Sequence, residues 1–352
     1  MELAAPVLAV CGFSGSGKTT LLESLIPRLR HQGLVVGVIK HDAHGVTVDY
    51  PGKDSDRLFQ AGAEVFLRAP NETFARFHPD PRRDLLWALD LLSRQVDLIL
   101  VEGHKDTPLP KVWLEHPENP EVPPGVTHVV ARLAWGQDRT GEALAVILRL
   151  VRENQPPLWV GVLMGGESSR MGSPKQLVLV GSRSALGRLA ELLAAHTSRV
   201  AYLGSGPLPT DAPQAPQIPD PPGPRGPLAG MVAALRWQPL ARWLFVPVDA
   251  VAATEEFLAW LVGQDRPGVW AVQPKGPTGQ LEPVFSLVHP QLARYLEGAW
   301  LEGLGPRVVA AHPKAAAIPV PENLADALAT ANTPEEWAKL TASGHSPKGG
   351  SG

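Results

Sequence analysis

The amino-acid sequence predicts two consecutive α/β domains, and three observations support this prediction. The chain has 352 residues, about twice the length of an ordinary domain. An apolar, strand-like run followed by a glycine-rich turn occurs near the N-terminus and again at residues 158–166. A polar, proline-containing break, Asn154-Gln155-Pro156-Pro157, precedes the second occurrence. We therefore expect domains at residues 1–155 and 158–340, followed by a disordered tail at residues 341–352.

The composition is that of a globular protein and excludes several classes. Hydrophobic residues make up 44% of the chain and charged residues 19%, which is enough apolar material for two cores. The formal net charge of -3 predicts no nucleic-acid partner. Cys11 is the sole cysteine, which excludes a disulfide framework and a cysteine-rich zinc site and fits a reducing compartment. No apolar run reaches the roughly 20 residues of a membrane span, so we expect a cytoplasmic protein with no membrane partner.

The first half contains three short apolar, β-branched runs that predict central parallel strands, at residues 7–10, 34–39 and 97–101. Residues 19–30 predict a helix, because leucines recur there at helical spacing and Gly33 provides a stop signal. Pro27 predicts a kink within this helix.

The second half predicts further strands at residues 158–163, 199–203, 243–248, 268–272 and 283–288. Residues 204–227 are dense in proline and small residues. They predict a long loop without regular structure, lying beside a site.

Residues 12–19 have the sequence GFSGSGKT, which satisfies the phosphate-binding pattern G-x-x-x-x-G-K-[ST]. In this pattern backbone N–H groups turn towards phosphate oxygens at the positive end of the following helix. Lys18 is expected near the β and γ phosphates, and the Thr19 hydroxyl is expected to bind Mg²⁺. The strand before the loop and the amphipathic helix after it favour a P-loop NTPase domain over a chance match. The expected nucleotide-binding residues are Gly12, Ser14, Gly15, Ser16, Gly17, Lys18, Thr19 and Thr20.

Two further groups of polar residues follow strands of this domain. Glu102 ends the third apolar run, and we expect it to be the carboxylate that a P-loop site needs near its metal ion. The alternative is an acid that only faces solvent. Residues 40–44, KHDAH, follow the second run and are switch-like or substrate-side residues rather than the less favoured zinc site. No Asn-Lys-x-Asp motif is present, so the pattern does not choose between GTP and ATP.

Residues 5–115 resemble the molybdopterin-guanine dinucleotide adaptor family, MobB. The resemblance rests on residues 6–20, 39–41, 48–55 (VDYPGKDS) and 97–103. It implies GTP binding with Lys18 and Thr19 at the nucleotide, weak GTP hydrolysis, and an assisting role towards a partner transferase. It also leaves a homodimer open, since adaptors of this family are often dimeric.

The second half contains another glycine-rich turn directly after a strand, with the sequence LMGGESSRMGSPK at residues 163–175. Gly165 and Gly166 permit close approach of the backbone to a nucleotide. Arg170 and Lys175 supply two cations for a triphosphate. A turn with both cations favours transfer chemistry at an α-phosphate over a plain structural turn.

Two acids complete this expected site. Asp249 ends the apolar run at residues 243–248, where a Mg²⁺ ligand is expected. The alternative role for Asp249 is an N-cap of the helix predicted after Thr254. Residues 226–230, GPLAG, open another predicted helix, with Asp220 upstream. They form either a wall of the nucleoside site or only a turn.

Residues 158–338 resemble the molybdenum cofactor guanylyltransferases, MobA. The matching segments, in the family's order, are residues 165–175, Asp220 with residues 226–230, and residues 246–249, 282–285 and 331–336. The resemblance implies a Rossmann-like nucleotidyltransferase fold, Mg²⁺ on Asp249, and transfer of GMP from GTP to the phosphate of Mo-molybdopterin with release of pyrophosphate. It assigns the GTP site to Leu163, Met164, Gly165, Gly166, Lys175 and Asp220, and the catalytic groups to Arg170, Lys175 and Asp249. It leaves molybdenum insertion proteins and apo-molybdoenzymes open as partners.

Several positions depart from the guanylyltransferase pattern. Pro174 stands where the family usually has Asp, Ala250-Val251 replaces Thr-Pro, and Leu203 and Thr330 stand where asparagines are common. Gly165 nevertheless favours guanine, because relatives that use CTP typically have Ala there. The alternatives that stay open are a cytidylyltransferase for the same pterin, a sugar-phosphate nucleotidyltransferase, and a non-catalytic GTP-sensing cofactor carrier.

Overall fold

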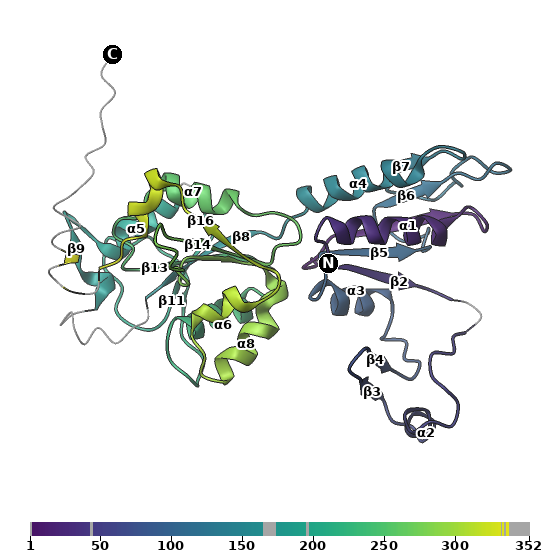
Figure 1. Cartoon of the computed structure of the whole chain (residues 1–352), viewed down its shortest axis with the longest axis horizontal. Helices are drawn as coiled ribbons and strands as arrows, with labels where there is room; N and C mark the ends of the chain where they lie inside the picture. Colours follow the sequence, from purple (N-terminus) through teal and green to yellow (C-terminus); the bar gives the residue numbers. More distant parts are fainter. Residues whose placement is uncertain are drawn as a thin grey trace, which may run out of the picture. The chain divides into compact units, whose positions relative to one another are not determined.

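A computed structural model of the protein describes residues 2–42, 45–164, 174–194, 197–331, 333 and 336–337. The chain forms two compact units (Figure 1): an N-terminal unit, Ala5–Leu150, and a C-terminal unit that combines Met1–Ala4 with Val151–Gly352. The predicted break at residues 154–157 lies between helix α4 (Arg139–Glu153) and strand β8 (Leu158–Leu163). No helix within the described ranges is long and apolar enough to cross a membrane.

The N-terminal unit is built on a parallel five-stranded sheet in the order β2-β5-β1-β6-β7. Its strands are β1 (Val7–Gly12), β2 (Val36–Lys40), β5 (Leu98–Glu102), β6 (Lys111–Leu114) and β7 (Val129–Leu133). Helices α1 (Lys18–His31) and α3 (Leu85–Ser93) pack on it. The predicted α/β class with a mostly parallel sheet is confirmed. Because parallel strands end at the same edge, the loops after β1, β5, β6 and β7 lie together.

Helix α1 begins directly after the glycine-rich turn, and the four leucines that predict it are all buried. The helix continues past Pro27 to His31. Pro27 is exposed to solvent, so its ring does not displace the sheet contacts, and the kink expected there stays a prediction.

A small two-stranded sheet stands apart from the main sheet of the N-terminal unit (Figure 1). It pairs β3 (Val65–Arg68) with β4 (Thr73–Arg76) antiparallel, next to helix α2 (Asp54–Gln60), which has no buried residue. Arg76 holds these pieces together. Its Nη1 donates to Asp56 Oδ1 at 2.9 Å, and its guanidinium carbon lies 3.8 Å from the centroid of the Phe59 ring. Sequence patterns did not predict this sheet, because too few of its side chains are buried to leave a hydrophobic period.

Strand β6 begins with a fully buried lysine. The Nζ of Lys111 donates to the carbonyl oxygens of Thr107 (2.8 Å), Leu109 (2.8 Å) and Thr127 (2.6 Å). Three acceptors match the three N–H donors of an ammonium group, so the buried charge is fully hydrogen-bonded. The same bonds fix the loop before β6 against the loop before β7.

The C-terminal unit is built on a mixed seven-stranded sheet in the order β12-β11-β8-β13-β15-β14-β16. Besides β8, its strands are β11 (Val200–Leu203), β12 (Gln217–Ile218), β13 (Arg242–Pro247), β14 (Ala271–Lys275), β15 (Ser286–Val288) and β16 (Ala315–Pro319). Strand β15 is antiparallel to both of its neighbours. Each of the five strands predicted in this half is present, with ends shifted by a few residues in four of them.

Helices cover both faces of this sheet. Helices α5 (Ala185–Ala194) and α7 (Glu255–Gly263) contribute to the hydrophobic core on one face, and α6 (Pro227–Trp237) and α8 (Ala293–Leu301) to the core on the other. The remaining short elements are β9 (Leu179–Val180), β10 (Arg183–Ser184) and the 3-10 turns η1 (Lys175–Leu177), η2 (Pro290–Leu292), η3 (Pro306–Ala311) and η4 (Glu322–Leu328). This three-layer α/β arrangement agrees with the Rossmann-like fold expected for the second half.

The prediction that residues 204–227 contain no regular structure is wrong at one point. Strand β12 forms within this segment and pairs parallel with β11. Its pairing is extended by bonds from Tyr202 N to Pro216 O and from Gly204 N to Ile218 O, both 2.8 Å long. Ile218 is buried against the sheet, so one apolar contact and the backbone bonds outweigh the local proline content. The predicted tail lies outside the described residues.

Candidate functional site

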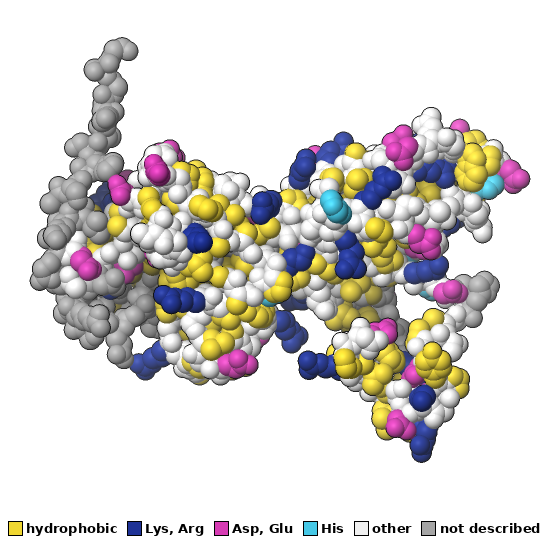
Figure 2. All heavy atoms as spheres, viewed as in Figure 1, with side chains coloured by type: hydrophobic (Ala, Val, Ile, Leu, Met, Phe, Trp, Pro, Cys, Tyr) yellow, Lys and Arg dark blue, Asp and Glu magenta, His cyan; other side chains and the backbone are white. Residues whose placement is uncertain are grey.

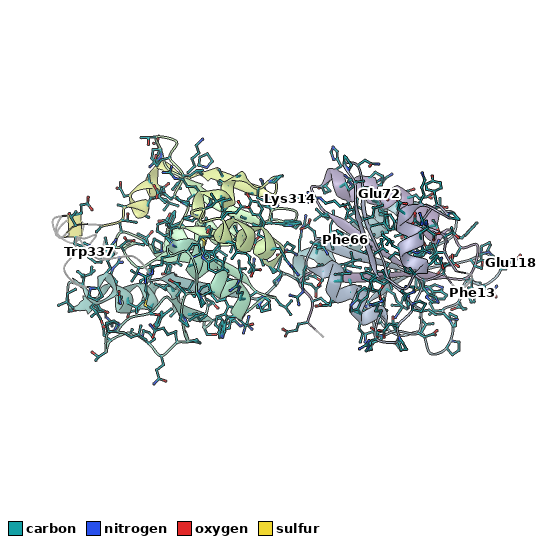
Figure 3. The ribbon with its side chains drawn as sticks, turned by 90° about the horizontal axis from the view of Figure 1, so that it is seen from below. Phe13, Phe66, Glu72, Glu118, Lys314 and Trp337 are labelled. Atoms are coloured by element: carbon teal, nitrogen blue, oxygen red, sulfur yellow. The ribbon has the colours of Figure 1, made fainter. Side chains whose placement is uncertain are left out.

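The first glycine-rich turn joins β1 to α1 and needs glycine for steric reasons. A Cβ at Gly12 would lie 2.5 Å from Ser16 Oγ and 2.8 Å from Leu114 O, closer than any side chain tolerates. Gly17, the N-cap of α1, has a φ of 87°, in the left-handed region that glycine adopts without strain. Phe13, labelled in Figure 3, projects from the turn and packs edge-on against Trp113 of β6, with ring centroids 5.6 Å apart.

Polar groups of this turn are arranged for an anion. The Nζ of Lys18 donates to the carbonyl oxygens of Gly12 (3.1 Å) and Phe13 (2.8 Å), so its charge lies over the turn. The Ser16 side chain is fully buried, and its Oγ has no hydrogen-bond partner among the described residues. A buried hydroxyl without a partner is costly unless a ligand satisfies it. Ser14 and Gly15 belong to the same turn, and Thr20 lies in the first turn of α1; their contact with a nucleotide stays a prediction.

The two expected metal ligands of this unit lie together. Glu102 ends β5 opposite Val10 of β1. The Thr19 hydroxyl donates to Glu102 Oε1 at 2.9 Å, and Lys40 Nζ lies 3.5 Å from the same oxygen. The Glu102 side chain is only 12% exposed, which disfavours the alternative of an acid that merely faces solvent. A hydroxyl and a carboxylate side by side are oxygen donors of the kind that Mg²⁺ prefers.

Two histidines meet near this edge. The rings of His41 and His104 lie 5.7 Å apart, and burial, followed by the charge of His41, lowers the pKa of His104. Within the described part of the chain, no group of three or more His, Cys, Asp or Glu residues is placed to hold a metal ion. His44, which belonged to the less favoured zinc interpretation, lies outside the described residues.

The sole cysteine lies beside the first glycine-rich turn (residues 12–19, called the phosphate loop from here on), and its thiol is unreactive. Cys11 is fully buried, and its thiol donates to Gly103 O at 3.0 Å. Burial is the main cause that raises the pKa of Cys11 to about 11, so the thiol stays protonated near neutral pH. Its contribution is to tie the end of β1 to the loop after β5.

Sequence reasoning missed Arg139, the first residue of α4. Its Nη1 donates to Ser16 O (2.8 Å), its Nε to Ala134 O (2.9 Å) and its Nη2 to Glu115 O. The side chain therefore connects the phosphate loop with the loops after β6 and β7. No local sequence pattern predicts this role, because all three acceptors are backbone carbonyls and two of them, Ser16 O and Glu115 O, are remote in sequence.

The second glycine-rich turn is described only at its two ends. Gly165, Gly166 and Arg170 lie outside the described residues. Leu163 and Met164, at the end of β8, are buried with exposed fractions of 5% and 6%. Lys175 opens η1 on the other side of the turn.

Lys175 and Asp249 form an ion pair at the carboxyl edge of the sheet. Lys175 Nζ lies 2.5 Å from Asp249 Oδ2, and the two side chains are 20% and 14% exposed. Asp249 follows β13, and its loop is held to β8 by a bond from Val248 N to Leu163 O (3.0 Å). The alternative role of Asp249 as a helix N-cap is wrong, because Thr254 caps α7 by accepting from Phe257 N. The cation and the acid predicted for one site are thus in direct contact.

Asp220 lies next to helix α6. Its Oδ1 would be 3.6 Å from a Cβ on Gly230, and Gly226 is the N-cap of the helix. Burial raises the pKa of Asp220. The structure therefore brings Asp220 against the GPLAG segment, at the start of α6.

One position that departs from the family pattern, Leu203, lies in the core, and the matching segment that begins at Ala331 meets the loop of Asp249. The Leu203 side chain is 1% exposed and belongs to the hydrophobic core, so it does not face a ligand. Ala331 N donates to Asp249 O at 3.3 Å, so the C-terminal segment meets the loop of the acid. Asn332, Pro334 and Glu335 of that segment lie outside the described residues.

Comparisons with known proteins divide the chain in the same order. The family described as molybdopterin guanine dinucleotide synthesis protein B (MobB) matches residues 7–133, and the MobA-like NTP transferase domain matches residues 160–316. The molybdopterin-guanine dinucleotide biosynthesis adapter protein of Haemophilus influenzae is 41% identical over 134 residues, which cover 37% of this chain and 74% of that protein. The adapter protein of Escherichia coli is 43% identical over 113 residues, or 31% of this chain and 65% of that protein.

The second half has relatives of its own. The probable molybdenum cofactor guanylyltransferase of Deinococcus radiodurans is 30% identical over 147 residues, which cover 42% of this chain and 75% of that protein. Among solved structures, molybdopterin-guanine dinucleotide biosynthesis protein A of Archaeoglobus fulgidus is 21% identical over 52% of this chain and 96% of its own, with a TM-score of 0.43. A structure of molybdopterin-guanine biosynthesis protein B is 25% identical over 42% of this chain and 99% of its own, with a TM-score of 0.35.

Taken with the fold, the matched families define a nucleotidyltransferase joined to a P-loop unit. The chain belongs to the MobB adapter family through its N-terminal unit and to the molybdenum cofactor guanylyltransferase family through its C-terminal unit.

Proposed function

We propose that the chain completes the guanine dinucleotide form of the molybdenum cofactor by transferring GMP from GTP to the phosphate of Mo-molybdopterin. The observation that carries this proposal is the contact between Lys175 and Asp249 at the carboxyl edge of the C-terminal sheet, in a chain of this family. A cation for phosphate and a carboxylate for a hard metal ion are the two groups that such a transfer requires.

The proposed reaction is a substitution at phosphorus. A phosphate oxygen of Mo-molybdopterin attacks the α-phosphorus of GTP, the bond from this phosphorus to the α–β bridging oxygen breaks, and pyrophosphate leaves with the bonding electrons. Lys175 is placed to stabilise the charge of the phosphates, and we assign the same role to Arg170. Asp249 offers the oxygen ligand for Mg²⁺, which when bound neutralises charge on the triphosphate. Leu163, Met164, Gly165, Gly166 and Asp220 are the proposed contacts to GTP.

We propose that the N-terminal unit binds a second GTP and assists the transfer. The buried, unpartnered Ser16 Oγ and the Lys18 ammonium over the turn support a phosphate ligand there. Thr19 and Glu102 are the proposed Mg²⁺ ligands of this unit. The proposed macromolecular partners of the chain are molybdenum insertion proteins and apo-molybdoenzymes, which would receive the product.

Pyrophosphate release by the purified full chain tests the transfer. With Mg²⁺, Mo-molybdopterin and GTP, we expect stoichiometric pyrophosphate and a guanine dinucleotide product, measured by a coupled pyrophosphate assay and mass spectrometry. Replacing GTP by CTP is expected to give much less product. A preference for CTP indicates the cytidylyltransferase alternative, turnover only with a sugar phosphate indicates the second alternative, and no pyrophosphate with any acceptor indicates a carrier.

We also propose that the chain forms a homodimer through the surface of α2, β3 and β4. This surface is rich in exposed apolar side chains (Figure 2): Phe66 is 72% exposed, Leu58 57% and Leu67 40%. A two-stranded sheet is marginally stable without further packing. Exposed apolar patches of this kind mark interaction surfaces, and a second copy supplies an equivalent apolar face.

Phe66→Ser is expected to convert the dimer into monomers of 37.6 kDa, because it replaces the most exposed apolar side chain of this surface by a polar one. Sedimentation velocity over a range of protein concentrations measures the change. Leu301→Ser is the matched control, since Leu301 is 66% exposed and lies on α8 of the other unit. A wild-type chain that stays monomeric at micromolar concentration, or a Phe66→Ser chain that stays dimeric, contradicts the proposal.

A further inference from the structure

The exposed indole of Trp135 lies in the loop that Arg139 ties to the phosphate loop. This loop follows β7, and the Trp135 side chain is 51% exposed. The guanidinium carbon of Arg139 lies 4.9 Å from the centroid of the Trp135 ring, and the ring of His116 lies 5.7 Å away at a tilt of 58°. One face of the indole is therefore backed by a cation, while much of the ring stays open to solvent.

This aromatic group borders the phosphate loop. Arg139 Nη1 donates to Ser16 O, and the same nitrogen would be 3.9 Å from a Cβ on Gly17. His116 Nε2 would be 3.9 Å from a Cβ on Gly15. Arg139 therefore hydrogen-bonds to the backbone on which the phosphates of a nucleotide would lie, and His116 lies beside the same turn.

We propose that Trp135 is the stacking platform for the base of the nucleotide whose phosphates the first glycine-rich turn holds. This inference rests on the proposed GTP binding by the N-terminal unit and adds the group that holds the base. A stack on indole is tolerant of the base, because every base has a π face. Trp135 therefore contributes affinity for GTP and ATP alike. Arg139 is a positioning residue that fixes the position of the Trp135 ring relative to the phosphate loop.

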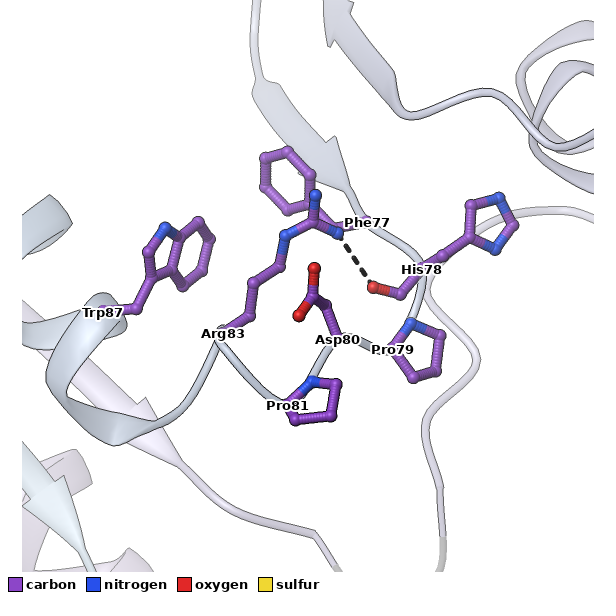
Figure 4. Close-up of a pocket in the computed structure, with 7 residues that line it drawn as sticks. All are labelled: Phe77, His78, Pro79, Asp80, Pro81, Arg83 and Trp87. Carbon is purple, nitrogen blue, oxygen red and sulfur yellow. Dashed lines mark hydrogen bonds between the residues drawn. The ribbon is translucent and has the colours of Figure 1, made fainter.

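One other group of aromatic and arginine side chains in this unit invites the same interpretation. It lines a shallow cavity of about 530 Å³ that includes Phe77, Arg83 and Trp87 (Figure 4). Here the arginine is already neutralised, since Arg83 Nη1 donates to Glu64 Oε1 and to His78 O, each at 2.8 Å. No residue of the phosphate loop lines this cavity. Trp87, which is 37% exposed, is therefore a matched control.

Calorimetric titration of the full chain tests the platform. All variants carry Lys175→Ala to weaken the second nucleotide site, and the heat that Lys18→Ala abolishes defines binding at the first. The ligands are the non-hydrolysable β,γ-imido analogues of GTP and ATP, and inorganic tripolyphosphate. We expect Trp135→Ala to weaken both nucleotides about tenfold and equally, to leave tripolyphosphate unchanged, and to be rescued by Trp135→Phe. Trp87→Ala is expected to change none of the three affinities.

Arg139→Met provides a second readout that separates the two roles. It is expected to weaken tripolyphosphate together with both nucleotides, because it releases Ser16 O as well as the indole. Unchanged nucleotide affinity in Trp135→Ala, or a parallel loss of tripolyphosphate affinity in that variant, overturns the proposed platform. If Lys18→Ala removes no binding heat from the Lys175→Ala chain, the proposed nucleotide site of the N-terminal unit is itself wrong. This outcome differs from a failure of the Trp135 platform alone, in which the heat that depends on Lys18 remains.

Discussion

Asp249→Ala is expected to lower pyrophosphate release by about 10²- to 10³-fold, the range seen when one group that stabilises developing charge is removed. The substitution takes away the proposed Mg²⁺ ligand. It also leaves Lys175, which is only 20% exposed, without the carboxylate that holds it. Both changes weaken the stabilisation of the triphosphate charge. They are not expected to lower the stability of the fold, because Asp249 lies at the edge of the sheet. The initial rate with saturating GTP and Mo-molybdopterin measures the effect.

Two further variants make the Asp249 result specific. Asp249→Asn keeps the shape of the side chain and removes only its charge, so it is expected to lose nearly as much activity as the alanine variant. Glu302→Ala is the control, since Glu302 is an exposed acid of the same unit, and its rate is expected to equal that of the wild type. Retention of more than half of the wild-type rate by Asp249→Ala would remove Asp249 from the reaction.

Lys18→Ala is expected to abolish nucleotide binding by the N-terminal unit while basal GMP transfer stays within about twofold of the wild type. The ammonium that lies over the turn is lost, and a cation beside a triphosphate in a water-poor cradle contributes several charge-assisted hydrogen bonds. The transfer site keeps Lys175 and Asp249, which belong to the other unit. Titration with a fluorescent GTP analogue measures the first effect, and pyrophosphate release measures the second.

Lys105→Ala is the matched control for Lys18→Ala. Lys105 is an exposed lysine of the same unit, and its removal is expected to change neither binding nor transfer. If Lys18→Ala instead lowers transfer as much as binding, the N-terminal unit takes part in every turnover, and its assisting role has to be replaced by an obligatory one.

Most of the strands that the sequence predicted consist of buried residues, although β2 was also predicted and only one of its residues is buried. Strands β1 and β5, apart from Glu102 at the end of β5, are apolar runs in the middle of a parallel sheet. Such runs can be recognised from the sequence without any knowledge of their neighbours. The contact between Thr19 and Glu102 follows from the same topology, because adjacent parallel strands end at one edge. Lys175 and Asp249 meet for an equivalent reason in the second sheet.

The remaining features depend on contacts that no local pattern encodes. Strand β12 is a two-residue strand among prolines, fixed by backbone bonds to β11. The β3–β4 sheet has largely exposed faces and is held by Arg76 rather than by a core. Arg139 resembles any exposed helical arginine in the sequence, and its role appears only when the loops after β1, β6 and β7 are brought together.

The buried ammonium of Lys111 is held in place by three hydrogen bonds at the start of β6. Three carbonyl oxygens surround the ammonium group, so the side chain acts as a covalently attached monovalent cation inside the protein. A shorter or neutral replacement would leave three buried acceptors without a donor, and a planar guanidinium does not present three N–H groups from one nitrogen as an ammonium does. A lysine at the start of β6 is therefore expected wherever three carbonyl oxygens of the neighbouring loops converge in this way.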